Sequence, residues 1–187
     1  MELTYILQIA TIVITLLLGL ISYYQTKKIQ HGQNIIAVTT KYRSERSEQL
    51  KEAGTVLLSN TAPALLEMSE SPAAMLKEAT AATERIGMIL HRNFKVDKEL
   101  IELASELLQT ATAYAQRKSD SSLRRLLYLQ DTFRLKCDLY SAADWNRIKQ
   151  ETKGENTSSQ SWIDYYAMLE ADFQDEFEAI KQKHGQK

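Results

Sequence analysis

The hydrophobic residues of the chain gather first in one long run, from Leu3 to Tyr24, that contains no charged residue. At 1.5 Å of rise per residue, about twenty helical residues cross the roughly 30 Å hydrocarbon core of a bilayer. Tyr5 and Tyr23 stand near the ends of the run, where aromatic rings anchor in the headgroup layers. The pattern predicts a retained transmembrane helix over residues 1–24. The alternative, a cleaved signal peptide, needs a basic start and a small-residue cleavage site.

Polar and small residues recur inside this run every three or four positions, which is the spacing of one helix face. They are Thr4, Gln8, Thr11, Thr15, Gly19 and Ser22. In lipid, helices associate through close packing at small residues and through side-chain hydrogen bonds of about 0.5–2 kcal/mol each. We therefore predict a self-association face. The alternatives are side chains that bond back to carbonyls of their own helix and a face that lines an aqueous pore.

After residue 24 the pattern becomes that of helices with polar faces. The stretch from Thr39 to Gln49 has no aliphatic residue, and its charges lie at i,i+4 spacing, so residues 25–60 are predicted as a solvated juxtamembrane stalk. Pro63 predicts the end of that helix. Ser71 and Pro72 then predict the cap and the first residue of the next helix.

Four further apolar faces at helical spacing predict a packed bundle. They run from Met75 to Ile89, from Leu100 to Tyr114 after a cap at Asp97, from Leu123 to Tyr140, and from Trp162 to Ile180. Short polar loops between these helices favour an antiparallel arrangement of neighbouring helices. The predicted fold is all-α: a transmembrane helix (1–24), a stalk (25–60) and a cytoplasmic four- to five-helix up-and-down bundle (61–187).

Composition and charge agree with this class. Only six of the 187 residues are glycine and two are proline, and a formal net charge of −1 argues against nucleic-acid binding by the whole protein. Lys27 and Lys28 follow the apolar run and Glu2 precedes it, so we predict contact with anionic lipid, an outside amino terminus and a cytoplasmic bundle. The single cysteine, Cys137, is predicted to be a buried, reduced thiol.

The sequence has none of the common catalytic signatures. It contains no phosphate-binding glycine loop, no dinucleotide fingerprint, no HExxH and no paired CxxC. Glu99, Glu102 and Glu106 share one helix side, but without the Glu-x-x-His pattern of di-iron bundles they are predicted to be solvated. We therefore predict a protein that is not an enzyme and that has no cofactor and no metal site.

Two charged surfaces are candidates for binding. A basic joint is a candidate site for a small anionic ligand, with ordinary surface charge as the alternative; it comprises Arg117, Lys118, Arg124 and Arg125. The acidic outer face of the last helix, between Asp164 and Glu178, is a candidate for a basic partner or for the basic joint of a second copy.

The order of features also carries a resemblance. The segments LTYILQIATIVITLLLGLISYYQT, KKIQ and ILHRNFKVDKELIELASELL look like those of small bacterial membrane-anchored helical proteins, some of which resemble accessory or effector components of phage defence. The resemblance implies a bacterial inner-membrane protein. The sequence thus supports two hypotheses: a non-enzymatic single-span protein whose bundle binds its own copies and an unidentified protein partner, or a pore-forming effector gated by a ligand or partner.

Overall fold

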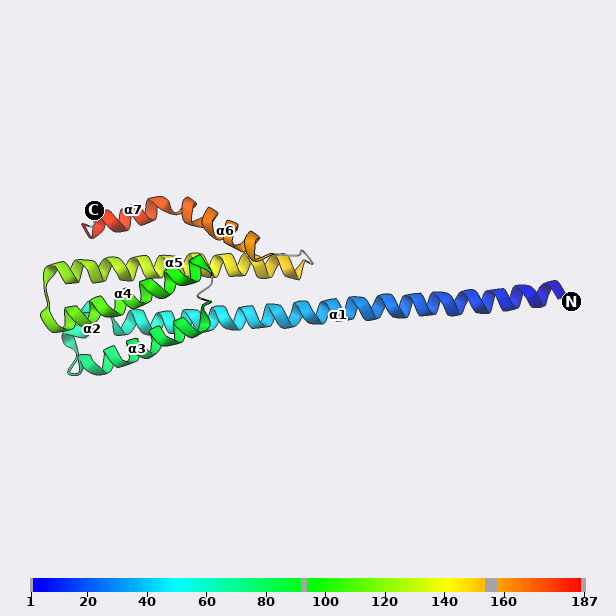
Figure 1. The fold of residues 1–187 in the computed structure, drawn as a ribbon, viewed down its shortest axis with the longest axis horizontal. Coiled ribbons are helices and arrows are strands. Elements are labelled where there is room, and N and C mark those ends of the chain that lie inside the picture. The colour runs from blue at the N-terminus through cyan, green and yellow to red at the C-terminus, as the bar shows by residue number, and fades with distance from the viewer. Residues whose placement is uncertain (1, 92–93, 154–157, 186–187) are drawn as a thin grey trace. The chain divides into compact units, whose positions relative to one another are not determined.

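The computed structural model describes the backbone of residues 2–91, 94–153 and 158–185; within this part, the side chains of residues 2–14, 16, 31 and 35 are not described. The described residues form seven helices and no strand, which confirms the all-α class. The helices are α1 (Glu2–Asn60), α2 (Pro63–Met68), α3 (Pro72–Ile89), α4 (Lys95–Arg117), α5 (Asp120–Thr152), α6 (Ser159–Asp172) and α7 (Gln174–Lys183) (Figure 1).

The chain divides into two compact units, Met1–Lys41 and Tyr42–Lys187. In the first unit, the described aliphatic side chains near the end of the apolar run are exposed. Within the described residues, no helix contains a stretch long and apolar enough to cross a membrane. Most side chains of the predicted transmembrane residues 1–24 lie outside the described part.

The second unit is a helical bundle, as predicted. α4 packs between α3 and α5, and α6 and α7 pack on α5 (Figure 1). The predicted faces of α3 and α4 form much of the core, together with residues from the end of α1 and from α5. The fully buried side chains include Leu50, Leu57, Leu66, Ile86, Leu100, Leu107, Leu126, Leu129, Phe133, Tyr140 and Tyr166.

The bundle begins earlier than the sequence suggested. Leu50, Ala53 and Leu57 of α1 are buried in the core, and Glu52 of the same helix accepts a hydrogen bond of 2.8 Å from Arg85 of α3. Residues 42–60 are therefore part of the second unit, whereas the sequence had placed them in a solvated stalk. The stalk prediction relied on the lack of aliphatic residues and on local charge pairs between Thr39 and Gln49, yet Arg43 and Arg46 in this stretch pair with Glu151 and Asp97, which lie far away in the chain.

The ends of the helices follow local chemistry, with two corrections. α1 ends at Asn60 and α3 begins at Pro72, as predicted. Asp97 is not a cap, because α4 begins at Lys95 and Asp97 lies buried in its first turn. The predicted last helix is broken at Phe173, whose φ of −99° and ψ of 18° separate α6 from α7. Phe173 itself is 36% exposed rather than inward-facing.

Candidate functional site

Arginines and carboxylates form a partly buried group at one end of the bundle, which we call the arginine–carboxylate cluster. It consists of Arg43 and Arg46 from α1, Asp97 from α4, and Tyr140, Asp144, Arg147 and Glu151 from α5. Helical spacing builds it, because these residues continue the buried faces of their helices at steps of three and four.

Arg46 joins α1 to α4 and α5. Its Nη2 donates to Asp97 Oδ2 at 2.9 Å and to the Tyr140 hydroxyl at 2.7 Å. Asp97 is 1% exposed, and its Oδ2 also accepts from the backbone N–H of His91 at 2.7 Å. One carboxylate oxygen therefore holds together the end of α3, the start of α4 and a side chain of α1. Charge-assisted bonds of this kind are stronger than neutral ones.

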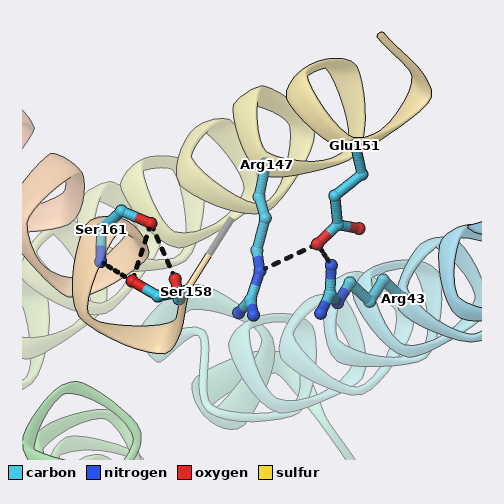
Figure 2. Close-up of polar contacts among 5 residues, drawn as sticks. All are labelled: Arg43, Arg147, Glu151, Ser158 and Ser161. Carbon is cyan, nitrogen blue, oxygen red and sulfur yellow. Dashed lines mark hydrogen bonds and ion pairs between the residues drawn. The ribbon is translucent and has the colours of Figure 1, made fainter. Parts of the chain in front are cut away.

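A second carboxylate joins α1 to α5. Figure 2 shows Arg147 and Glu151 extending from α5 towards Arg43 of α1, with Glu151 Oε1 between the two guanidinium groups. Arg43 Nη1 donates to this oxygen, and Arg147 Nε lies 3.4 Å from it. In the same view, Ser158 caps α6 by accepting from the backbone N–H of Ser161 at 3.1 Å.

Asp144 is a buried carboxyl group of the cluster. It is 6% exposed, and burial raises its pKa to about 6, although Arg46 and Arg147 oppose that shift. Among the described residues, none makes a hydrogen bond or a close ion pair with it. Burial likewise raises the pKa of Tyr140, with Asp144 and Asp97 adding to the shift. The cluster can therefore take up a proton on Asp144 at mildly acidic pH while its arginines stay charged.

A cavity of about 30 Å³ lies inside the cluster, lined in part by Asp97, Arg147 and Trp162. Several buried polar atoms of its lining have no hydrogen-bond partner within the protein: Arg46 Nε, Asp97 Oδ1, Arg147 Nε and Trp162 Nε1. About 10–15 Å³ of such volume is enough for one water molecule. A water there can accept from two of these N–H groups and donate to Asp97.

The structure describes the side chains of only part of the predicted transmembrane stripe. Thr4, Gln8 and Thr11 lie outside the residues whose side chains are described. Thr15, Gly19 and Ser22 are described and exposed, and a Cβ atom added to Gly19 would meet nothing within 4 Å. The lipid-contact residues Lys27 and Lys28 are exposed as well. The functions assigned to these positions remain predictions.

The predicted basic joint lies at the turn between α4 and α5. Arg117 ends α4, Lys118 adopts the left-handed conformation with φ of 42°, and Arg124 is exposed in the first turns of α5. Arg125 is paired with Glu106 of α4, and its guanidinium lies 5.1 Å from the centre of the Tyr128 ring. An anionic ligand would therefore compete with Glu106 for one of the four cations.

The carboxylates that were predicted to be solvated are largely paired. Lys136 Nζ of α5 donates to Glu99 Oε2 of α4 at 2.9 Å and to Glu170 Oε1 of α6 at 2.8 Å. Burial alone lowers the pKa of Lys136, but these two carboxylates outweigh it and raise that pKa. Glu106 pairs with Arg125, and Glu102 pairs with Lys98 of its own helix. Among the described residues, no group of three or more His, Cys, Asp or Glu is arranged to hold a metal ion.

The sequence patterns do not predict the arginine–carboxylate cluster. They place Arg43 and Arg46 in the stalk and give no signal for Asp144, Arg147 and Glu151. The available signal was register: Arg46 precedes the buried Leu50 by four residues and Arg43 precedes Arg46 by three. Burying a charged side chain without a partner costs free energy. Charged residues that continue a core face therefore need partners of opposite charge there.

Fold and cluster together define an all-α bundle braced by buried ion pairs. Comparison with known protein families, with curated proteins and with solved structures gives no significant match.

Proposed function

We propose that this chain is a non-enzymatic, single-span membrane protein whose helical bundle binds its own copies and a protein partner on the cytoplasmic side. The observation that carries the proposal is the exposed apolar surface at the end of the uncharged run. Leu17, Leu18, Leu20 and Ile21 are each between 53% and 61% exposed. Contiguous aliphatic surface of this kind needs a cover of lipid or protein. With the uncharged stretch from Leu3 to Tyr24, insertion into a bilayer supplies that cover.

The bundle is suited to recognition because its interior is rigidly braced. Partly buried ion pairs of the arginine–carboxylate cluster join Arg43 and Arg46 of α1 to α5 and α4. Outer faces carry charges of both signs, which suit selective pairing with a partner. Because the apolar run is covalently continuous with the bundle, its insertion concentrates those faces at the membrane.

Membrane insertion is tested by alkaline carbonate extraction of membranes from cells that express the full chain. The wild-type protein is expected in the pellet. A variant with Leu17→Lys and Leu18→Lys places two charges in the span, each costing up to about 3 kcal/mol near the helix centre, and is expected to shift to the extracted fraction. The matched control carries Gln109→Lys and Gln116→Lys on the exposed face of α4 and is expected to stay in the pellet.

Self-association is tested separately, by chemical cross-linking in native membranes at low expression. Dimers or larger species are expected from the wild type, and Gly19→Leu is expected to reduce them, because the added side chain blocks close approach of two helices. Leu20→Phe adds bulk off the predicted stripe and serves as the control. Monomer alone from the wild type would contradict the oligomer proposal and leave the anchor intact.

A further inference from the structure

A groove lies between the end of α1 and the middle of α5. It has a volume of about 640 Å³, and its floor is mainly apolar. Leu58 and Cys137 are partly exposed apolar residues of the lining, and Leu50, Gly54 and Phe133 are buried; Thr55, Ser59 and Gln130 also line the groove. A volume of this size lies within the usual range of small-molecule sites, which combine an apolar interior with a few polar groups.

The groove is elongated along α1. Gln130 Nε2 of α5 donates to the backbone carbonyl of Leu58 at 3.2 Å, and Phe133 faces Gly54, so the two helices run antiparallel on either side of it. The lining extends from Leu50 to Ala62 on α1. At 1.5 Å per residue this length is about 18 Å, which suits an extended acyl chain laid along the helix.

Gly54 lies at the base of the groove. Glycine inside a helix costs about 1 kcal/mol relative to alanine. A Cβ at this position would lie 3.5 Å from Phe133 Cε1 and 3.9 Å from Cys137 Sγ, which are ordinary contact distances. Packing between α1 and α5 therefore does not require glycine here. Gly54 and Phe133 are themselves buried, so the missing side chain leaves a narrow slot at the base of the groove.

The mouth of the groove carries two cations. Lys51 and Arg134 line it, both are exposed, and neither makes an ion pair with any residue that the structure describes. Asp138 is the third charged residue of the lining, so the mouth has a net charge of +1. An elongated apolar floor beneath unpaired cations matches a molecule with one apolar chain and one anionic head.

We propose that this groove binds a single-chain anionic amphiphile, namely a free long-chain fatty acid. The acyl chain lies along the groove against Leu58 and Cys137, and the carboxylate meets Lys51 and Arg134. This activity is independent of the proposed membrane anchor and partner binding, because it uses only residues of the bundle.

The test uses photoactivatable diazirine palmitate with the full-length protein in native membranes, followed by peptide mass spectrometry. Labelling is expected within residues 50–62 and 130–138. Unlabelled palmitate is expected to compete, whereas palmityl alcohol and a trimethylammonium amphiphile of equal chain length are not. Myristate is expected to compete roughly fifteen-fold less well, because two buried methylenes contribute about 0.8 kcal/mol each.

Two substitutions at Gly54 test whether the fatty acid occupies the groove. Gly54→Leu fills the floor and is expected to reduce labelling at least tenfold, and the milder Gly54→Ala preserves packing and is expected to reduce it partially. Gly87→Leu is the matched control, because a Cβ at Gly87 meets nothing within 4 Å. Melting temperatures of all three variants separate loss of ligand from loss of fold. Lys51→Gln with Arg134→Gln is expected to remove the preference for palmitate over the alcohol.

Several results would overturn the proposal. Labelling confined to peptides outside the groove would assign the probe to another surface. Equal labelling of Gly54→Ala, Gly54→Leu and wild type would show that the floor is not occupied. Labelling only by a phospholipid that carries the same diazirine chain would replace the free fatty acid by membrane lipid. Cross-links between copies at Lys51 without any fatty-acid labelling would assign the groove to a second copy of the chain.

Discussion

Asp144 makes a specific prediction about how stability depends on pH. It is 6% exposed, and burial raises its pKa from 3.8 to about 6. Folding therefore favours the protonated carboxyl. The stabilising contribution of this group is fully present below pH 3.8, its unfolded pKa, and is lost as pH rises through 6. Asp144→Asn replaces the acid by a neutral amide of the same shape and removes this dependence.

The magnitude follows from the size of the shift. A change of one pKa unit corresponds to 1.36 kcal/mol, so a rise from 3.8 to about 6 corresponds to about 3 kcal/mol. The difference in unfolding free energy, variant minus wild type, is therefore expected to grow by about 3 kcal/mol from acidic pH to pH 8. Taking the difference cancels the titration of groups that the substitution does not touch.

Urea unfolding followed by tryptophan fluorescence measures this difference in the full-length protein. Trp162 lines the cluster cavity and is buried, so its emission reports the unfolding of this region. Trp145 is 57% exposed and is replaced by phenylalanine in both proteins to isolate the signal. The control is Asp138→Asn, at an exposed position of the same helix. A difference in unfolding free energy that stays constant with pH, or that shrinks as pH rises, would show that burial does not raise the pKa of Asp144.

Three further predictions concern other parts of the molecule. Asp97→Asn removes a charge from the buried pair with Arg46 and is expected to lower the unfolding free energy by about 3 kcal/mol in the same urea assay; a loss below 1 kcal/mol would contradict the bracing role. Lys118→Gly relieves a left-handed residue and is expected to stabilise by about 0.5–1 kcal/mol, visible as a higher melting temperature. If the chain is a pore-forming effector, Gln8→Leu with Thr15→Leu is expected to abolish toxicity on expression, and undiminished toxicity at equal protein levels would exclude a pore along that stripe.

The apolar faces of the bundle were predictable from the sequence because their signal is local. Leu100, Ala104, Leu107 and Ala111 repeat at steps of three and four, and all are buried in α4. Pro72 likewise marked the start of α3 by its own geometry. Features of this kind need no knowledge of what lies opposite.

The arginine–carboxylate cluster was not predictable in the same way. The sequence shows an arginine at position 46 whether its side chain faces water or pairs with Asp97, which lies 51 positions further along the chain. Asp97 before an apolar face has the sequence signature of a helix cap, yet its carboxylate serves α1 and the end of α3 instead. Pairing across helices decides these roles, and the sequence does not state which helices are neighbours.

The break at Phe173 had no local signal either, because neither proline nor glycine occurs between α6 and α7. Tertiary contacts hold α7 against α5 beyond the break. His184, at the end of α7, is 7% exposed, and its Nε2 lies 2.9 Å from Asp131 Oδ2 of α5. Burial alone raises the pKa of Asp131, but His184 and Lys183 outweigh it and lower that pKa.

Protease accessibility of the full chain, in spheroplasts and in inverted inner-membrane vesicles, tests the membrane-anchored arrangement most directly. The bundle from Tyr42 onwards is expected to survive protease added to spheroplasts and to be digested in inverted vesicles. The apolar run is expected to stay in the membrane fraction. Digestion of the bundle from outside intact spheroplasts, or recovery of the chain in the supernatant of washed membranes, would contradict it.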